Sequence, residues 1–421
     1  MKYIKRIVDE EIATKLSVMG AILIKGPKWC GKTTSAKQLA KSVLEMQNPD
    51  LHENQLELAR TKPSLLLEGN KPRLLDEWQL APVLWDAVRY SVDKVSIPGQ
   101  YILTGSATPI DDPNRHSGVG RFAFITMKSM TLYESGESNG SISLKELFDG
   151  GANIDGKRTD LTYENLAFIL CRGGWPSAIK LEGKKALEIS KSYLEVLCDS
   201  DISRVDNVKR DPHLARIIVK SYARQISTIN SNQALYDDIR SQHADVSERT
   251  IMDYLGVLKR LFIIEEIESW NPNIRSKTSI RSAPKKSMVD PSIATAALEC
   301  SPEELMMDIK TYGLLFENLV NRDLSVYVNK IGGYINHFRD RFGLECDNVI
   351  HLNNGKYALV EVKLSGSKIK EAEEHLLKLK ALINENKKLR EPEFLMIITA
   401  TDLAYTTEAG IHVVPIGCLK D

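Results

Sequence analysis

The first 135 residues alternate between short apolar runs and a stretch with helical spacing. Continuous apolar runs predict buried strands at 21–25, 101–104 and 122–127, with shorter strand pieces at 65–67 and 74–75. Apolar or small side chains recur at helical spacing over 33–44, which predicts a helix there. Strands that alternate with helices are typical of a mostly parallel sheet covered by helices.

Helical spacing dominates the middle of the chain, beyond a polar, glycine-rich stretch at 133–156. Two helices are predicted at 234–240 and 247–262, followed by an apolar strand at 262–267 and a basic, turn-rich segment at 271–287. This order is similar to a winged helix. Several basic side chains then become candidates for contacts with DNA phosphates: Arg249, Lys259, Arg260, Lys285 and Lys286. A purely structural helical module is the alternative, and both stay open.

The last hundred or so residues return to an α/β pattern. Helices are predicted near 311–324 and 368–385, and strands near 334–338, 345–352, 357–364 and 394–399.

Composition and charge narrow the class of protein. The chain has 421 residues, enough for two to four domains, and 43% of them are hydrophobic, which is enough for an ordinary core. Lysine plus arginine and aspartate plus glutamate both number 56, so the net charge gives no overall attraction to nucleic acid or membranes. The six cysteines lack zinc-site spacing, and no apolar run approaches the roughly 20 residues of a membrane span. We therefore expect a cytoplasmic protein.

A phosphate-binding loop follows the first predicted strand. Nine consecutive residues match and extend G-x-x-x-x-G-K-[ST]: Gly26, Pro27, Lys28, Trp29, Cys30, Gly31, Lys32, Thr33 and Thr34. The glycines allow a tight turn whose N–H groups point at phosphate oxygens, and the following helix adds its positive end. Lys32 is expected to bridge the β- and γ-phosphates of ATP, and Thr33 to bind Mg²⁺.

Two adjacent carboxylates follow the apolar pair at 74–75. Asp76 is expected in the magnesium shell, and Glu77 is expected to polarise the attacking water. The strand at 101–104 leads to Ser106, which is either a sensor hydroxyl near the γ-phosphate or a simple cap of the turn. Arg121 is a candidate arginine finger, acting on a neighbouring subunit or on its own chain, with Arg115 as the competing candidate and a solvated loop arginine as the alternative.

These segments resemble a known family. Residues 26–34, 74–79, 104–106 and 120–121 look like the AAA-type ATPase domain of a large prokaryotic ATP-binding family, in which a C-terminal domain of unknown function follows. The likeness continues at 201–204, 284–290, 316–320, 345–347 and 361–363, so it covers nearly the whole chain. A proline-leucine-serine turn that is common in the family is replaced here by 127–130, with Glu134 beyond. The resemblance implies ATP binding and hydrolysis.

The C-terminal part carries a second set of carboxylates. Period-two alternation places Glu361 and Lys363 on one face of a strand, and Asp347 lies on the preceding strand. Two neighbouring strands can bring Asp347 and Glu361 together around Mg²⁺, with Lys363 beside the attacking water and Glu317 as a further ligand. The pattern resembles restriction-endonuclease-like nucleases, whereas a hairpin with solvated charges is the alternative.

Three domains are therefore predicted in this α/β protein. They are a P-loop NTPase parallel-sheet domain at 1–135, a helical and winged-helix-like region at 136–300, and a restriction-endonuclease-like α/β domain at 301–421. The leading hypothesis is an ATPase, with ATP and Mg²⁺ as cofactors, that couples nucleotide state to a DNA-handling domain. The alternative is a nucleotide-switched module that binds a protein partner. An oligomer stays open.

Overall fold

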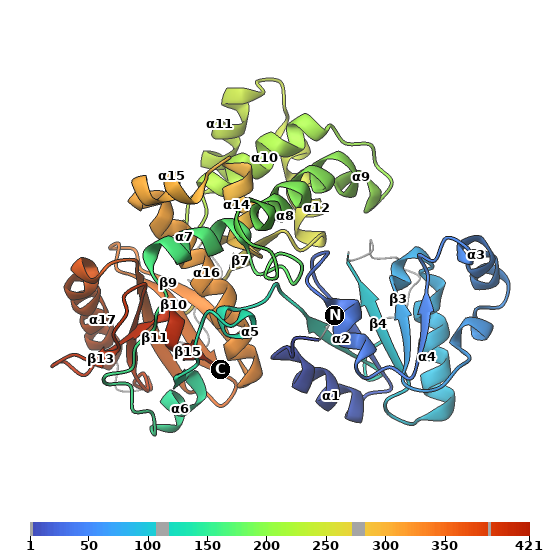
Figure 1. The fold of residues 1–421 in the computed structure, drawn as a ribbon, viewed down its shortest axis with the longest axis horizontal. Helices are drawn as coiled ribbons and strands as arrows, with labels where there is room; N and C mark the ends of the chain where they lie inside the picture. The colour runs from blue at the N-terminus through green and yellow to red at the C-terminus, as the bar shows by residue number, and fades with distance from the viewer. Residues whose placement is uncertain (1–2, 107–117, 272–282, 386–388) are drawn as a thin grey trace. The chain divides into compact units, whose positions relative to one another are not determined.

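The computed structural model describes residues 3–106, 118–271, 283–385 and 389–421 (Figure 1). The chain forms two compact units. The first unit comprises Met1–Ser129, Ser200–Arg210 and Gly256–Ile263, and the second comprises Met130–Asp199, Asp211–Leu255 and Ile264–Asp421. The predicted boundaries at 135 and 300 stay a prediction. Arg275, Lys277 and Arg281 of the predicted basic segment and the competing finger Arg115 lie outside the described residues.

The first unit is built on a parallel five-stranded sheet with the order β2-β3-β4-β1-β5. Its strands are β1 (Ala21–Lys25), β2 (Ser42–Glu45), β3 (Arg73–Asp76), β4 (Tyr101–Gly105) and β5 (Phe122–Thr126). Strand β4 lies between β1 and β3, so the C-terminal ends of these three strands are neighbours at one edge of the sheet.

Helices cover both faces of this sheet. They are α1 (Val8–Val18), α2 (Lys32–Lys37), α3 (His52–Thr61) and α4 (Val83–Val95), with 3-10 turns at Pro63–Leu67 and Trp78–Leu80. The mostly aliphatic core against α3 and α4 contains the aromatic residues Trp78, Trp85, Tyr101 and Phe122. Trp85 stacks on Phe122 with ring centroids 3.9 Å apart, and it lies 5.4 Å from Trp78.

Two predictions in this unit are wrong. The helix predicted at 33–44 ends at Lys37, and Ser42–Glu45 is a strand instead. Pairing of β2 with β3, in which Val43 lies beside Leu74, overrides the helical spacing of the local sequence. The piece predicted as a strand at 65–67 belongs to a 3-10 helix that begins at Pro63, where the fixed proline φ favours a helical first turn.

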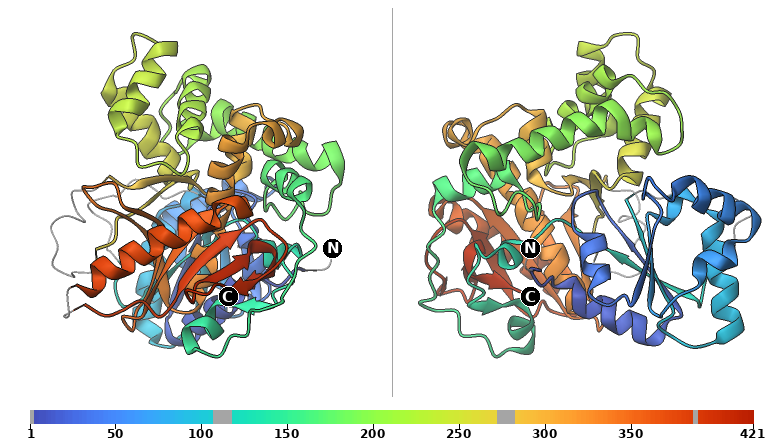
Figure 2. Two further views of the ribbon diagram at one scale, coloured as in Figure 1. Left: turned by 90° about the vertical axis from the view of Figure 1, so that its left-hand side faces the viewer. Right: turned by 45° about the vertical axis from the view of Figure 1, so that its right-hand side comes forward.

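The second unit contains a six-stranded mixed sheet with the order β13-β14-β12-β11-β10-β9 (Figure 2). Its strands are β9 (Gly333–Arg339), β10 (Glu345–Leu352), β11 (Tyr357–Lys363), β12 (Leu395–Thr399), β13 (Tyr405–Thr406) and β14 (His412–Pro415). Strands β9, β10 and β11 are antiparallel neighbours, whereas β11, β12 and β14 run parallel. Helix α17 (Ile369–Asn384) packs on one face, and α16 (Ile309–Lys330) lies on the other.

Most of the remaining elements of the second unit are helical. They are α5 (Leu132–Ser135), α6 (Leu144–Asp149), α7 (Tyr163–Arg172), α8 (Gly183–Val196), α10 (Pro212–Arg224), α11 (Asn232–Gln242), α14 (Pro291–Ala297) and α15 (Pro302–Met307). Helix α12 (Glu248–Arg260) begins in this unit and ends in the first. Two short sheets complete the unit, β7 (Ile264–Ile267) with β8 (Lys285–Met288) and β6 (Ile142–Ser143) with β15 (Leu419–Lys420).

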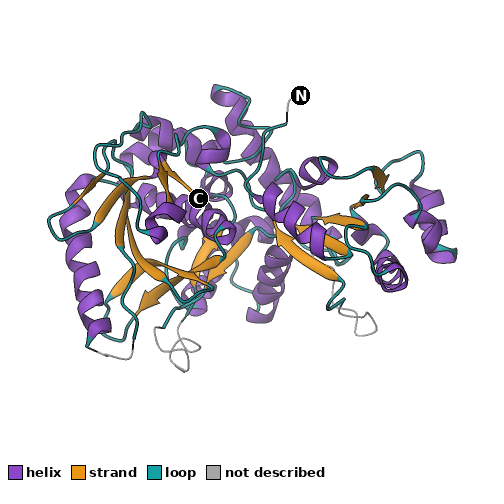
Figure 3. Ribbon diagram, turned by 90° about the horizontal axis from the view of Figure 1, so that it is seen from below, coloured by secondary structure: helices purple, strands orange, loops and turns teal. Residues whose placement is uncertain are grey.

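The observed architecture confirms the predicted fold class at the level of mixed α/β. A parallel sheet is followed by a helical middle and a C-terminal mixed sheet, and Figure 3 shows the strands gathered in separate sheets among the helices. The winged-helix and restriction-endonuclease-like details stay predictions. Among the described residues, no helix combines the length and apolar character that crossing a bilayer needs.

Candidate functional site

The loop between β1 and α2 has the tight backbone that phosphate binding needs. Gly26 has φ +153°, and a Cβ at this position would lie only 2.1 Å from the backbone oxygen of Met127. Gly31, the N-cap of α2, has φ +101°. Both positions therefore require glycine, because an L side chain would clash or strain the turn.

Lys32 lies over its own loop. Its side chain is buried, and Nζ donates to the backbone oxygens of Gly26 at 3.0 Å and of Pro27 at 2.7 Å. The buried Arg6 supports the loop from elsewhere, because it donates to the backbone oxygen of Cys30 at 2.7 Å. The ammonium group of Lys32 is thus held against two carbonyls of its own loop, where a phosphate oxygen would replace them as its acceptor.

Asp76 lies at the end of β3 and meets hydroxyl groups from two other elements. Its Oδ1 accepts hydrogen bonds from Thr33 Oγ1 at 2.7 Å and from Thr104 Oγ1 at 2.5 Å. The order of the strands explains this convergence, because β4 delivers Thr104 between β3 and the loop that follows β1. The structure therefore brings together Thr33 and Asp76, the two residues predicted as magnesium ligands.

Glu77 follows directly with a left-handed backbone, at φ +55°. Its Oε2 accepts a hydrogen bond from Ser106 Oγ at 3.1 Å and another from Gln79 Nε2. Ser106 therefore contacts the candidate catalytic carboxylate. Gln79 and Thr104, which hold the two carboxylates, were not predicted as site residues; their presence in the segments that carry the family resemblance was the available signal.

Arg121 lies at the other end of the sheet. It precedes β5, and the register pairs Phe122 with Ala21, at the start of β1, whereas the phosphate loop follows the end of β1 at Lys25. Its guanidinium pairs with Asp93 at 2.6 Å. The structure therefore does not bring Arg121 to the loop of its own chain, and a role in a neighbouring subunit stays a prediction.

A distant segment contacts the loop. Nζ of Lys28 donates to Oδ1 of Asp201 at 2.6 Å, and both residues belong to the first unit. The same segment, Ser200–Arg210, carries Asp206, which pairs with Arg210 at 2.6 Å and with Arg260 at 3.3 Å. These contacts were missed from the sequence, where 201–204 stood out only through the family resemblance.

In the second unit, four predicted residues meet and a fifth joins them. Lys363 Nζ lies 2.6 Å from Glu361 Oε2 and 3.3 Å from Asp347 Oδ2. Lys285 of β8 lies 2.7 Å from Glu317 Oε1 and 3.7 Å from Asp347 Oδ1, and it donates to the backbone oxygen of Asp347 at 2.9 Å. The two ammonium groups therefore lie among three carboxylates, in what we call the lysine–carboxylate cluster.

Burial and charge act in opposite directions in this cluster. Burial raises the pKa of Glu317 to about 7, although Lys285 favours its ionised form. Burial also opposes ionisation of Asp347, but the cations Lys285 and Lys363 prevail and lower its pKa to about 2. Burial, followed by the charge of Asp347, raises the pKa of Glu361 well above its ordinary value. Of the three carboxylates, Asp347 therefore favours the ionised form most strongly, and it lies between two cations.

Two lysines predicted to contact DNA are buried. The exposed fractions of Lys285 and Lys286 are 3% and 4%. Lys285 belongs to the lysine–carboxylate cluster, and Lys286 donates to the backbone oxygen of Asn230. The prediction that they form a phosphate-binding surface is therefore wrong, because neither ammonium group faces the solvent. All four residues of β8 are buried, so this basic strand is an interior one.

The buried His337 next to this cluster makes stability depend on pH. Burial, with Lys285 as a second cause, lowers the pKa of its imidazole from 6.5 to about 4, and Nε2 lies 3.2 Å from the backbone oxygen of Ala283. Between pH 6.5 and 4, the unfolded chain therefore binds a proton at His337 that the folded chain does not bind. The free energy of unfolding should fall as pH falls through this range, by up to about 1.4 kcal/mol per pH unit. The urea midpoint at pH 7.5 and 5.5 measures this effect.

The matched variant is His337→Gln, which keeps a nitrogen donor near Ala283 without an ionisable ring. Its urea midpoint should change less between the two pH values than that of the wild type. Equal pH dependence in the two proteins would rule out His337 as the source.

A second buried charge group stabilises the same unit. Arg322 of α16 pairs with Asp290 at 3.0 Å and with Asp323 at 2.7 Å, and all three side chains are at most 1% exposed. Asp290 also accepts hydrogen bonds from the backbone N–H groups of Gly174 and Ser292, each at 2.9 Å. This group joins α14, α16 and the turn after α7, which gives Asp290 of the family-like segment 284–290 a structural role.

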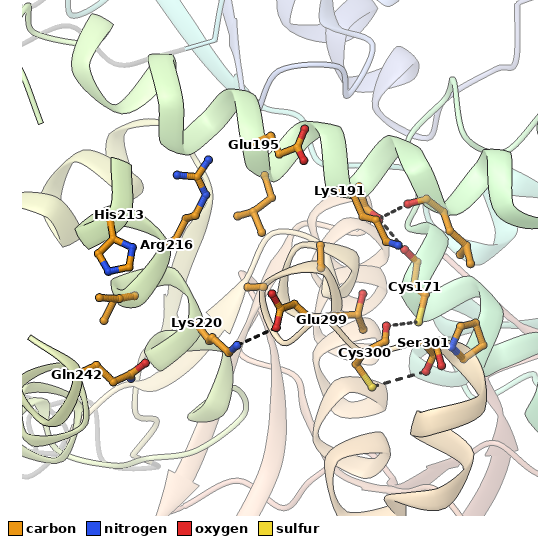
Figure 4. A pocket seen from close by; sticks show the side chains of 18 residues that line it. Cys171, Lys191, Glu195, His213, Arg216, Lys220, Gln242, Glu299, Cys300 and Ser301 are labelled. Carbon is orange, nitrogen blue, oxygen red and sulfur yellow. Dashed lines mark hydrogen bonds and ion pairs between the residues drawn. The ribbon is translucent and has the colours of Figure 1, made fainter. Parts of the chain in front are cut away.

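A separate pocket of about 570 Å³ lies among α8, α10 and the connection from α14 to α15 (Figure 4). Two of its cations are already neutralised, since Lys220 pairs with Glu299 at 3.1 Å and Arg216 pairs with Asp199 at 2.6 Å. Burial raises the pKa of the Cys171 thiol in its wall to about 12, which leaves that group unreactive at neutral pH. None of the predicted site residues lines this pocket.

A glycine-dependent loop follows β1, and Asp76 ends β3, which is separated from β1 by β4 alone. This arrangement defines a P-loop ATPase domain of the AAA type. Comparison with protein families agrees, because residues 19–135 match the AAA domain. Residues 312–419 match the domain of unknown function DUF4143, and 163–304 match another, DUF8612. The chain therefore carries an AAA-type P-loop domain joined to a C-terminal DUF4143 domain, which confirms the family resemblance.

Individual relatives are more distant. Uncharacterized proteins of Mycobacterium tuberculosis (Rv2008c) and Mycobacterium bovis (Mb2031c) are each 30% identical over 120 residues, or 28% of this chain. The match spans only 27% of either relative. Among solved structures, the Walker-type ATPase PABY2304 of Pyrococcus abyssi is similar at 15% identity with a TM-score of 0.40, covering 69% of this chain and 94% of that one.

Proposed function

We propose that the first unit binds and hydrolyses ATP. The observation that carries this proposal is the convergence of Lys32, Thr33 and Asp76 at one edge of the parallel sheet. A buried ammonium group, a ring of loop N–H groups and the start of α2 together form a site for a polyphosphate. The nine loop residues from Gly26 to Thr34 are the proposed contacts to the nucleotide.

The residues around Asp76 fit Mg²⁺. Thr33 Oγ1 and Asp76 Oδ1 are both oxygen ligands, of the kind that this ion prefers, and they lie 2.7 Å apart. When bound, Mg²⁺ would neutralise charge on the β- and γ-phosphates. Thr104 helps to orient Asp76 through a hydrogen bond of 2.5 Å to the same carboxylate oxygen.

Glu77 is the proposed base that orients the attacking water. Ser106 and Gln79 hold its carboxylate, and its position directly after Asp76 keeps it near the metal ligands. Replacement by glutamine keeps the shape of the side chain but removes the charge that polarises water. We expect Glu77→Gln to lower ATP turnover on the order of 100-fold.

A steady-state phosphate-release assay, together with titration of a fluorescent ATP analogue, measures both parts of this prediction. The nucleotide affinity of Glu77→Gln should stay within about threefold of the wild type, because the proposed phosphate ligands are unchanged. Glu68→Gln, at an exposed position before the same strand, is the control. Full turnover by Glu77→Gln would assign the base to another residue.

Nucleotide state is further proposed to act on a DNA-handling C-terminal domain with nuclease-like residues. Glu317, Asp347, Glu361 and Lys363 meet in one cluster, which supports this part of the proposal. Its test is incubation of plasmid, linear and single-stranded DNA with the protein and Mg²⁺ or Mn²⁺. Cleavage that Asp347→Ala removes would establish the activity, and its absence in both proteins would exclude it.

The alternative, a nucleotide-switched module that binds a protein partner, is favoured by a specific observation. Lys285 and Lys363 occupy the space among the carboxylates, and the described residues contain no group of three or more His, Cys, Asp or Glu side chains arranged to hold a metal ion. ATP turnover with and without DNA separates the two functions. Stimulation by DNA supports DNA handling, whereas an unchanged rate supports the protein-binding module.

A further inference from the structure

The phosphate loop contains a second lysine, Lys28, whose partner lies 173 residues further along the chain. The side chain of Lys28 is 39% exposed, whereas that of Asp201 is 8% exposed. Lys28 is therefore the solvent-accessible partner of this pair, whereas Asp201 is largely enclosed by the fold. Because Lys28 belongs to the proposed phosphate loop, two anionic partners are available to it once a nucleotide binds, the Asp201 carboxylate and the phosphates of the nucleotide.

We propose that the terminal phosphate of ATP takes Lys28 away from Asp201, so that this ion pair distinguishes ATP from ADP. The inference rests on the proposed function, since it requires a nucleotide in the loop. It assigns Asp201 to the nucleotide site as a residue that acts through Lys28.

Electrostatics favours this exchange for ATP more than for ADP. The terminal phosphate of ATP brings about one more negative charge than ADP carries, whereas a carboxylate offers a single charge and two oxygens. The nearly buried Asp201 cannot move far into water, so it either loses Lys28 or stays close to the triphosphate and is repelled. Lys32 faces a comparable exchange, since it now donates to the loop carbonyls of Gly26 and Pro27.

The position of Asp201 connects the loop of the first unit to helices of the second unit through the chain itself. Asp201 ends a π-helical turn, Leu197–Asp201, and α9 (Ile202–Arg204) follows. The segment Ser200–Arg210 belongs to the first unit, but α8 before it and α10 after it belong to the second. Loss of the contact with Lys28 thus removes a restraint on a segment that continues into helices of the other unit at both ends.

Asp201→Asn tests the competition directly. In the full chain, the affinity for a non-hydrolysable ATP analogue should rise about fivefold, the size expected for a partly exposed ion pair, while the ADP affinity stays within about twofold. Asp199→Asn is the matched control, because Asp199 lies two residues earlier and pairs with Arg216 at the same 2.6 Å. It should leave both affinities unchanged.

An Asp201→Asn protein that binds the analogue as the wild type does, or more weakly, would overturn the inference while leaving the proposed function intact. A wild-type protein that binds neither nucleotide would overturn both. These outcomes are distinguishable in one calorimetric series with the two nucleotides.

Lys28→Met establishes whether Asp201 acts through this lysine. The variant should bind the ATP analogue at least about fivefold more weakly, with a smaller loss for ADP, because it lacks one charge-assisted contact. Lys37→Met is the control, since Lys37 of α2, the helix that follows the loop, forms an equally short but exposed pair with Glu45 of β2. In the double variant, Asp201→Asn should have no further effect on the analogue; a remaining gain would mean that Asp201 acts by direct repulsion and would contradict the exchange.

Hydrogen exchange of the unaltered protein provides a measurement that does not depend on a variant. Amides in 200–210 should exchange faster with the ATP analogue bound than with ADP bound, because only the analogue frees Asp201 from Lys28. Equal exchange rates in the two complexes would overturn the inference.

Discussion

Replacing Lys32 by alanine is expected to weaken ATP binding at least about 100-fold, because two charge-assisted hydrogen bonds to phosphates are lost. The structure makes this side chain hard to replace. Lys32 is only 5% exposed, and its ammonium group lies against Gly26 and Pro27 at the inner side of the loop. No water-exposed lysine can take its place without rebuilding that turn.

Isothermal titration calorimetry with ATP and Mg²⁺ measures the effect. Lys37→Ala removes a lysine from the same short helix, where the side chain is 42% exposed and pairs with Glu45, and it should bind ATP as the wild type does. Unchanged thermal unfolding of Lys32→Ala without nucleotide would show that the loss is one of binding. Tight ATP binding by Lys32→Ala would show that the phosphates are held elsewhere.

The second large effect is expected at Arg322, whose replacement by methionine should destabilise the second unit by about 3–5 kcal/mol. Methionine fills much of the space but leaves Asp290 and Asp323 buried without their cation. Both carboxylates must then stay charged in an apolar interior or take up protons. Burial already raises the pKa of Asp323 to about 6, against the opposing effect of Arg322.

The pH dependence identifies this mechanism. Protonated carboxylic acids need no cation. In urea-unfolding experiments, Arg322→Met should therefore lower the free energy of unfolding less at pH 5 than at pH 8. Arg158→Met is the control, since Arg158 pairs with Asp402 at 2.6 Å on the surface and its loss should cost less than about 1 kcal/mol. A deficit that is the same at both pH values would indicate lost packing instead of unpaired charge.

The sequence was most informative where a local pattern agrees with the packing. Tyr357–Lys363 and Glu345–Leu352 are strands close to or at their predicted bounds. The apolar run at 357–360 suits a strand that is covered on both faces of the sheet. It failed at 42–45, where Val43 and Leu44 continue a helical spacing but pair with β3. Pairing between strands that are far apart in sequence depends on residues that lie outside the short stretch from which the helix was predicted.

The candidate site shows the same division. Thr33 and Asp76 converge as expected, because the loop motif and the strand ending fix both positions in a parallel sheet. Asp201 and Lys285 were missed as partners, since their contacts join segments separated by 173 and 62 residues. Arg121 lies at the far end of its strand from the loop of its own chain, which only the register reveals, and its role in a neighbouring subunit stays a prediction.

The first unit is discontinuous along the chain, and this has a consequence for biosynthesis. Residues of Ser200–Arg210 and Gly256–Ile263 complete it. Asp206 pairs with Arg210 within the first of these segments and with Arg260 of the second. A ribosome that has released only 135 residues has therefore not yet supplied all of the first unit. The complete unit is available only once residue 263 has emerged. A fragment cut at residue 135, the end of the AAA-domain match, lacks Asp201, the carboxylate that now holds Lys28.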